Sequence, residues 1–431
     1  MKITLSSLIT VVVFFLNFST AFAANVDFIP RISISEEYTD NLNLDASDEK
    51  EDFITTITPG FSLDIDARSS GLILSYDAGY SFYDEYDEYD SWRHSASVTG
   101  WAELSRRTRL EVTDRFLYTE DPQDDDDEDE RDFTLRTGRE PYYTNTASVA
   151  ILHQFGEADT LELRYEYSIL ENDDKTEEDN SRHIPSANLT WWVVPRQLSL
   201  ETGVEYTRGE FTGAAEADSL SDDFDRWVGN IRLTKVIRRE LNIFAEYTHT
   251  WLDYDGEEID YQIYDPSVGF TYTWGEDASL TLGVGYFYQD RESGDDESGV
   301  TIDGDISKTW RFRRSSINLT GSSGYDQSYF GSENLGFDVY YGVEALATHA
   351  FSRHVTGDAF SSYRKDKYTE TEDDREDDTI EAGCGITAQL NRWLSTRLGY
   401  TFTNVNSDDR EDEYTENSVI LTFTLAPSSP I

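Results

Sequence analysis

The sequence predicts an all-β protein: a transmembrane, antiparallel, up-and-down β-barrel of roughly 20 strands, within a range of about 18–22. Three observations predict it. Apolar and polar residues alternate over long segments, connections alternate between tight turns and long acidic loops, and aromatic residues gather where strands reach those loops. Because lipid offers no hydrogen bonds, a sheet that crosses a membrane must close on itself.

Composition excludes several other classes of protein. The 431 residues carry 86 Asp and Glu against 35 Lys and Arg, a net charge of −51, which repels nucleic acid. Aromatic residues make up 14%, too many for a disordered acidic chain. A single Cys allows neither an internal disulfide nor a Cys-based zinc site. A mean hydropathy of −0.59 argues against a bundle of membrane helices.

The first element is a targeting segment. Lys2 precedes a mostly apolar run, Leu5 to Phe18, and Ala21-Phe22-Ala23 forms a small-x-small cleavage signal. We interpret residues 1–23 as a secretory signal peptide and residues 24–431 as a single barrel. A membrane anchor is the alternative, but the apolar run is shorter than the roughly 20 residues that a spanning helix needs.

The strands come next, and each shows a period of two. In 72–82, one face carries Leu72, Leu74, Tyr76, Ala78, Tyr80 and Phe82, and the other carries Ile73, Ser75, Asp77, Gly79 and Ser81. The same alternation recurs in 161–169, 198–206 and 280–288. In 110–118, Asp114 falls on the apolar face, which predicts a β-bulge or a position near the rim.

The connections alternate in kind along the chain. The tight turns are Asp66–Ser70, Ser105–Arg107, Gly156–Asp159, Pro195–Gln197, Ile237–Glu240, Gly275–Ala278, Arg313–Ser315, Ser352–His354 and Asn391–Trp393. The long acidic loops are 39–52, 84–90, 120–140, 172–180, 211–223, 254–259, 291–298, 328–335, 368–377 and 407–413. Nine turns and ten loops delimit twenty strands, so the repeated unit is a hairpin rather than a propeller blade. A soluble sandwich or solenoid is the structural rival.

Aromatic residues end the strands that run into the acidic loops, as in the outer girdle of a membrane barrel. The expected girdle is Tyr80, Tyr167, Tyr206, Trp251, Tyr288, Tyr325, Tyr363 and Phe402. The last strand, Val419 to Leu425, is similar to the terminal strand that the barrel-assembly machinery reads, although Ala426–Ile431 trails beyond it.

Charge is sorted by end, with basic residues beside the tight turns and acidic residues in the long loops. A solvated, repulsive surface explains the acidic loops most simply. The alternative is loosely bound Ca²⁺ or Mg²⁺, which carboxylates suit and which could bridge to lipopolysaccharide. Its candidates are Asp124, Asp125, Asp126 and Asp127 in the longest loop. No other cofactor is expected.

The polar strand faces predict a water-lined lumen. The candidate lumen residues are Asp77, Glu162, Arg164, Glu166, Glu201, Glu205, Glu246 and Arg397. Barrels of about 16–18 strands already enclose water, so roughly twenty leave room for a pore. Only about 6 residues are expected between the signal and the first strand, so we expect no domain-sized plug. The loop at 120–140 could fold inward or stand in solvent, and acidic walls favour cations.

Nothing in the sequence indicates catalysis. The six His residues are scattered over several hairpins, and each is expected at a rim or in the lumen. Gly-x-Ser-x-Gly, His-Glu-x-x-His and phosphate-loop motifs are absent from the sequence. We therefore expect a protein that is not an enzyme.

The opening of the barrel, Pro30 to Leu44, reads Pro-Arg-Ile-Ser-Ile-Ser-Glu-Glu-Tyr-Thr-Asp-Asn-Leu-Asn-Leu. This strand, which ends Glu-x-Tyr-x-Asp-Asn, resembles the start of the PEP-CTERM system-associated outer-membrane β-barrels and the related "putative β-barrel porin" families. The resemblance in style covers the mature chain. It implies an outer-membrane barrel associated with exopolysaccharide and protein-sorting loci, and it supplies no catalytic residues.

These observations support three functional hypotheses for an outer-membrane protein of a Gram-negative bacterium. The first is a porin-like channel that passes ions or small hydrophilic solutes, with a preference for cations. An exopolysaccharide-export channel is the second, and the third is a barrel that displays acidic loops for adhesion or divalent-cation binding. Outer-membrane lipid, lipopolysaccharide and the assembly machinery are the expected partners, with exopolysaccharide-export components under the second hypothesis and no nucleic acid under any.

Overall fold

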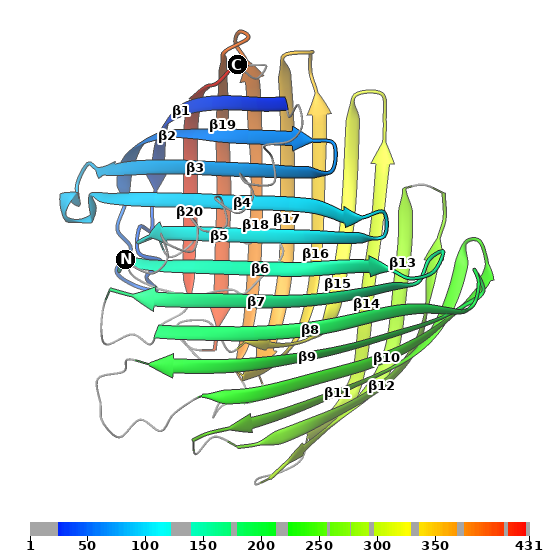
Figure 1. The fold of residues 1–431 in the computed structure, drawn as a ribbon. Helices are drawn as coiled ribbons and strands as arrows, with labels where there is room; N and C mark the ends of the chain where they lie inside the picture. Colours follow the sequence, from blue (N-terminus) through cyan, green and yellow to red (C-terminus); the bar gives the residue numbers. More distant parts are fainter. Residues whose placement is uncertain are drawn as a thin grey trace.

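A computed structural model shows that the chain forms one closed antiparallel barrel (Figure 1). The structure describes residues 25–427 except 122–138, 174–178, 213–222, 257–258, 276, 293–296, 329–335, 369–374 and 409–412. The predicted signal peptide lies outside these residues. Within the described part of the chain, no helix has the length and apolar character needed to cross a membrane.

Twenty strands follow one another around the barrel, and each pairs with its neighbour in the sequence. They are β1 Asn25–Thr39, β2 Asp52–Ala67, β3 Ser70–Tyr83, β4 Ser91–Ser105, β5 Thr108–Thr119, β6 Tyr142–Gln154, β7 Thr160–Asn172, β8 Asp179–Val194, β9 Leu198–Thr212, β10 Phe224–Arg238, β11 Leu241–Tyr254, β12 Tyr261–Thr273, β13 Ala278–Arg291, β14 Glu297–Arg311, β15 Ser315–Ser328, β16 Gly336–Ala350, β17 Val355–Tyr368, β18 Glu376–Gln389, β19 Leu394–Ser407 and β20 Tyr414–Leu425. One short 3₁₀ turn, η2 Asp87–Tyr89, lies between β3 and β4. The predicted fold class and strand number are confirmed.

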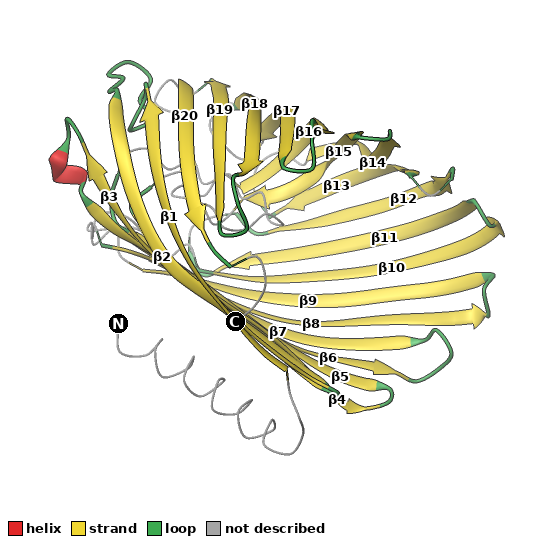
Figure 2. Cartoon of the chain, turned by 90° about the horizontal axis from the view of Figure 1, so that it is seen from above, coloured by secondary structure: helices red, strands yellow, loops and turns green. Residues whose placement is uncertain are grey.

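The first and last strands close the sheet. β1 pairs antiparallel with β20 from Ile32 opposite Leu425 to Thr39 opposite Ser418. Closure gives every strand two neighbours, so the sheet has no edge strand, which is what a membrane sheet requires. Figures 1 and 2 show the result as a wide barrel, and in Figure 1 the strands of the near wall cross those of the far wall steeply.

The two ends of the barrel differ. Nine connections between the strands, from β2–β3 to β18–β19, have two to five residues, and the other ten have five to twenty-two. All three register shifts in the ladders lie beside short turns: between Glu103 and Ser105, Trp192 and Val194, and Val236 and Arg238. The end with the nine short connections is here called the turn end, and the other is the loop end.

Candidate functional site

The strand register divides the side chains into two sets around the whole barrel. One set carries the exposed aliphatic and aromatic side chains, such as Ile231, Trp251, Val268, Val284 and Val300. In a membrane barrel this set faces lipid. Residues of the alternate set, which pair only with one another from strand to strand, form the inner wall. That wall is the candidate functional site.

The eight residues predicted for the lumen all lie on the inner-wall set. Glu201 and Glu205 of β9, for example, are opposite Arg232 and Val228 of β10, and Glu246 of β11 is opposite Arg232. The remaining members are Asp77 on β3, Glu162, Arg164 and Glu166 on β7, and Arg397 on β19.

Several of these acids are paired with arginines on the same wall. The ion pairs are Arg31–Asp77, Arg164–Glu162 (3.1 Å), Arg226–Glu205 (3.2 Å), Arg232–Glu246 (3.3 Å) and Arg397–Asp358 (2.7 Å). The residues predicted for the lumen did not include Arg31, Arg226, Arg232 and Asp358. Each lies on the polar face of its strand, so a register counted from the tight turns is the signal that could have found them. The paired positions contribute no net charge to the wall.

Two of these ion pairs reach across a strand, and a glycine on the intervening strand leaves the space. Arg31 on β1 and Asp77 on β3 both face Gly60 on β2. The Arg31 Nε donates to Asp77 Oδ1 at 2.8 Å, and its Nη2 contacts the other carboxylate oxygen. A Cβ on Gly60 would overlap Asp77 Oδ1. The absence of a side chain at position 60 is therefore what lets the pair form.

The same arrangement recurs on the opposite side of the seam between β1 and β20. Arg397 of β19 binds both oxygens of Asp358 on β17, at 2.7 and 2.9 Å, across Gly385 of β18. A Cβ on Gly385 would lie 2.5 Å from Arg397 Nη2. Bidentate arginine–carboxylate pairs have fixed geometry, so these two pairs brace the wall on both sides of its closure.

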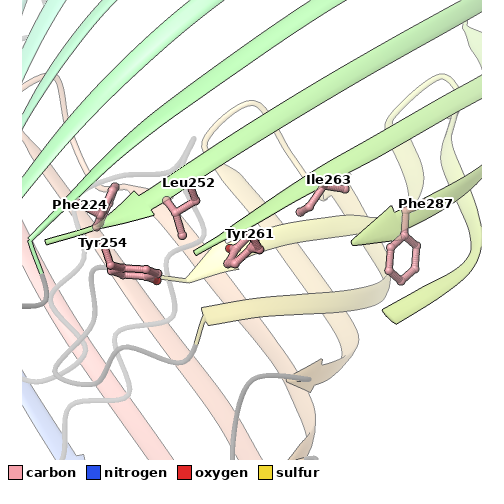
Figure 3. Packing of buried hydrophobic residues seen from close by; sticks show 6 residues of the cluster. All are labelled: Phe224, Leu252, Tyr254, Tyr261, Ile263 and Phe287. Atoms are coloured by element: carbon pink, nitrogen blue, oxygen red, sulfur yellow. The ribbon is translucent and has the colours of Figure 1, made fainter. Parts of the chain in front are cut away.

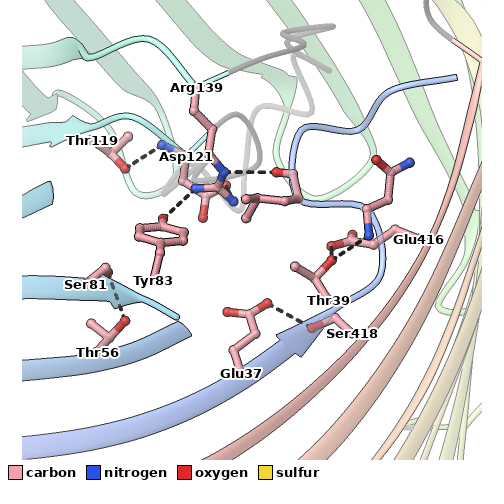
Figure 4. A network of polar contacts seen from close by, with 12 residues as sticks. Glu37, Thr39, Thr56, Ser81, Tyr83, Thr119, Asp121, Arg139, Glu416 and Ser418 are labelled. Atoms are coloured by element: carbon pink, nitrogen blue, oxygen red, sulfur yellow. Dashed lines mark hydrogen bonds and ion pairs between the residues drawn. The ribbon is translucent and has the colours of Figure 1, made fainter. Parts of the chain in front are cut away.

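At the loop end, the first loop folds against the inner wall. Leu42 is almost fully buried and packs with Ile54 of β2 and Tyr83 of β3. Arg139 holds it there: its Nε donates to the Leu42 carbonyl at 2.9 Å and its Nη1 donates to the Tyr83 hydroxyl at 2.8 Å (Figure 4). The loop at 40–51 thus narrows this part of the mouth. Most of the loop expected at 120–140 lies outside the described residues.

Arg139 lies among acidic groups in the same network. Its Nη2 is 3.8 Å from Asp121, and Glu120 and Glu37 are close enough to act on its charge. Burial lowers the pKa of the Arg139 guanidinium, but these acids and Tyr83 outweigh it, so the net shift is upward. For Glu120, burial is the largest influence and raises the carboxyl pKa. Arg139 therefore stays a cation, whereas the carboxyl of Glu120 resists ionisation.

A second buried cluster lies on the inner wall at the loop end of β10–β13. Figure 3 shows its six members: Phe224, Leu252, Tyr254, Tyr261, Ile263 and Phe287. Glycines on the wall make room for two of the rings, because a Cβ on Gly209 would lie 2.7 Å from Phe224 and one on Gly299 would lie 2.7 Å from Phe287. The mouth is therefore packed with apolar side chains on this side, in contrast with the charged wall below.

The residues predicted for the aromatic girdle fall on the lipid-facing set near the loop end. These are Tyr80, Tyr167, Tyr206, Trp251, Tyr288, Tyr363 and Phe402; the side chain of Tyr325 lies outside the described part. The neighbouring strands add rings that were not among the predicted girdle residues. Trp92 lies 4.9 Å from Tyr80 and Trp227 lies 4.7 Å from Tyr206 between ring centroids.

One interpretation of the sequence is wrong. Asp114 does not mark a bulge or a rim, because β5 pairs with β4 and β6 without a register shift around it. It lies in the middle of β5 on the lipid-facing set, where Asn145 of β6 donates to its Oδ1 at 3.3 Å. A neighbouring amide rather than an irregular backbone accommodates the carboxylate.

The metal candidates Asp124 to Asp127 lie outside the described residues. Among the residues that are described, no group of three or more His, Cys, Asp or Glu side chains could hold a metal ion.

Comparisons with known proteins agree with this architecture. A family model described as "Putative beta-barrel porin 2" matches residues 27–157 and 221–426. The FrpB iron transporter from Neisseria meningitidis superposes with a TM-score of 0.58 at 10% identity, covering 93% of this chain and 82% of that one. The siderophore receptor PirA from Pseudomonas aeruginosa gives a TM-score of 0.54 at 10% identity, with 93% and 80% covered. At such low identity these likenesses show the fold alone. No curated protein matches the sequence.

Proposed function

Because the chain belongs to the "Putative beta-barrel porin 2" family and is a porin-like barrel of the Gram-negative outer membrane, we propose that it is an open channel. Ions and small hydrophilic solutes cross it by diffusion, and cations are preferred. The protein has no catalytic role. The turn end faces the periplasm and the loop end faces outside, as is usual for bacterial outer-membrane barrels.

The observation that carries this proposal is the closed 20-stranded wall with a polar inner face. Barrels of about 16–18 strands already leave an aqueous channel, so a wider barrel encloses more water. Its inner wall is lined by ion pairs and hydroxyl groups, which stay hydrated and let polar solutes pass. The aliphatic and aromatic set on the other face matches a lipid environment.

The preference for cations follows from where unbalanced charge remains. Arginines neutralise several acids of the wall, whereas the chain as a whole carries a net charge of −51. Acidic loops at one mouth concentrate cations there before they enter. We therefore assign the selectivity to the loop end rather than to the middle of the lumen.

Single-channel recording in a planar bilayer tests the proposal. The refolded mature protein is expected to give large, steady conductance steps, and a salt gradient is expected to give a reversal potential of the sign for cation preference. Protein that has been heat-unfolded before addition is the control. A folded barrel, verified by its β-sheet circular dichroism, that gives no steps would overturn the channel function.

A further inference from the structure

We propose that the inner wall over β2–β7 carries a binding subsite for neutral, hydroxyl-rich solutes of the saccharide class. This inference rests on the channel function proposed above and assigns a solute class to it. It is carried by a pocket in the wall, by the side chains that line this pocket, and by the charges around it.

A row of hydroxyl side chains crosses this part of the wall at mid-height. The register places Ser62, Ser75, Ser97, Arg115, Thr146 and Ser168 opposite one another on six successive strands. Within the row, Ser75 donates to Ser62 at 3.4 Å, and the Thr146 and Ser168 hydroxyls lie 3.1 Å apart. Five of the six side chains are small, so the wall is recessed here.

The recess forms a pocket of about 360 Å³. Five hydroxyl groups line it: Ser75, Ser95, Ser97, Thr144 and Thr146. The Arg31–Asp77 pair borders it on one side, and Arg115 lies on the row itself. Ligand pockets are usually about 300–1,000 Å³, so the volume suits one small ring or a segment of a chain.

The lining chemistry favours a ligand with many hydroxyl groups. Each Ser or Thr hydroxyl both donates and accepts a hydrogen bond, as each sugar hydroxyl does, and an arginine only donates while an ionised carboxylate only accepts. The pocket therefore offers mixed donors and acceptors over a short span of wall. An apolar solute would leave these groups without partners, at a cost in binding free energy.

The charges around the pocket favour a neutral solute. Asp77 neutralises Arg31 through a bidentate pair, which leaves Arg115 as the remaining charged side chain of the lining. The strongly negative field of the whole chain opposes the entry of anions. A neutral solute is not repelled by this field and needs no opposite charge in the pocket. We therefore commit to an uncharged saccharide rather than to a sugar acid.

The test measures block of the single-channel current by maltotriose, compared with a polyethylene glycol of similar size. The wild type is expected to show a saturable decrease in current with maltotriose and none with the polymer. The double variant Ser97→Ala/Thr144→Val is expected to weaken this block by about tenfold or more, because several hydrogen bonds are lost. Block is measured as a fraction of each variant's own current in salt alone, so a change in open conductance does not affect the comparison.

Thr248→Val, on the inner wall of β11 outside this pocket, is the matched control. Maltotriose is expected to block it as strongly as it blocks the wild type. Equal block by maltotriose and polymer would overturn the subsite, and so would tighter block by glucuronate than by maltotriose. Calorimetric titration of maltotriose into the protein in detergent separates the two proposals. Binding without conductance overturns only the channel function, and conductance without binding overturns only the subsite.

Discussion

At the scale of single residues, glycines decide where charge can be paired across the lumen wall. Gly60 and Gly385 lie under the Arg31–Asp77 and Arg397–Asp358 pairs. A polar pair also flanks Gly285, where Asp265 and Thr301 approach from β12 and β14. Glycine is unfavourable in a strand interior. Here that cost is offset by ion pairs and hydrogen bonds that cross an intervening strand.

Substitution of Gly60 by alanine tests this role. The added Cβ would overlap the Asp77 carboxylate and separate it from Arg31, so we expect a loss of about 1–3 kcal/mol in the free energy of unfolding. Denaturant unfolding in lipid vesicles, followed by Trp fluorescence, measures it. Gly229→Ala is the control, because a Cβ there meets no atom within 4 Å. Equal stability of the two variants would contradict the explanation.

The residue scale also shows what the sequence could not predict. Alternation alone placed Asp77 and Glu246 on the polar face, because the face of a residue depends only on its position within its strand. Arg31 was missed as the partner of Asp77 because the two are 46 residues apart and an intervening strand separates them. Asp114 was misread because the amide that accommodates it, Asn145, belongs to a different hairpin.

At the scale of elements, the tight turns explain why the strand number was predictable. Each tight turn fixes where two neighbouring strands meet, and the period of two then fixes the face on which each residue of those strands lies. The loops were less accessible to prediction. The inward fold of the loop at 40–51 depends on Arg139, which is 97 residues from Leu42 in the sequence, and no local pattern encodes such a contact.

Arg139→Gln is expected to loosen this loop. A glutamine cannot reproduce the two hydrogen bonds to the Leu42 carbonyl and the Tyr83 hydroxyl, so their buried oxygens lose partners, at a cost of about 1–3 kcal/mol. We expect lower stability and more noise in the open-channel current. The control is Arg196→Gln, whose ion pair with Glu157 is exposed and contributes little. If the open-channel current of both variants is as free of noise as that of the wild type, Arg139 does not hold the loop at the mouth.

The two strand faces predict opposite responses to the same substitution. Ile231→Arg places a charge in the middle of β10 on the lipid-facing set, which costs about 2–4 kcal/mol near the bilayer midplane. Thr248→Arg places the same charge on the inner wall of the adjacent strand. It is expected to preserve stability and to reduce conductance. Denaturant unfolding measures the stability of both variants, and single-channel recording measures their conductance. If Thr248→Arg is less stable than Ile231→Arg, the faces have been assigned wrongly.

At the scale of the whole molecule, closure and charge act together. The β1–β20 ladder converts a chain of hairpins into a wall with no edge strand, and the paired arginines keep much of that wall neutral. The net charge of −51 is therefore expressed mainly at the loops. The closed shape brings ten loops that are far apart in the sequence to one mouth, where their fields add.

This arrangement predicts where ion selectivity can be changed. Glu85, Asp87 and Glu88 are exposed in the loop between β3 and β4, so Glu85→Gln/Asp87→Asn/Glu88→Gln removes three charges without disturbing the wall. We expect the ratio of cation to anion permeability to fall, as read from the reversal potential in a salt gradient. The change should be larger near 0.1 M than near 1 M salt, because the screening length shortens from about 10 Å to about 3 Å.

Glu157→Gln removes a charge at the turn end, where Glu157 is paired with Arg196. For each charge removed, we expect it to shift the reversal potential less than the triple loop variant does. A reversal potential that changes with Glu157 but not with the loop carboxylates would place the selectivity at the opposite mouth. Insensitivity to both would place it at the acids of the inner wall that lie outside the ion pairs. The loop variant and Glu157→Gln therefore locate the selective region along the length of the channel, which conductance alone cannot do.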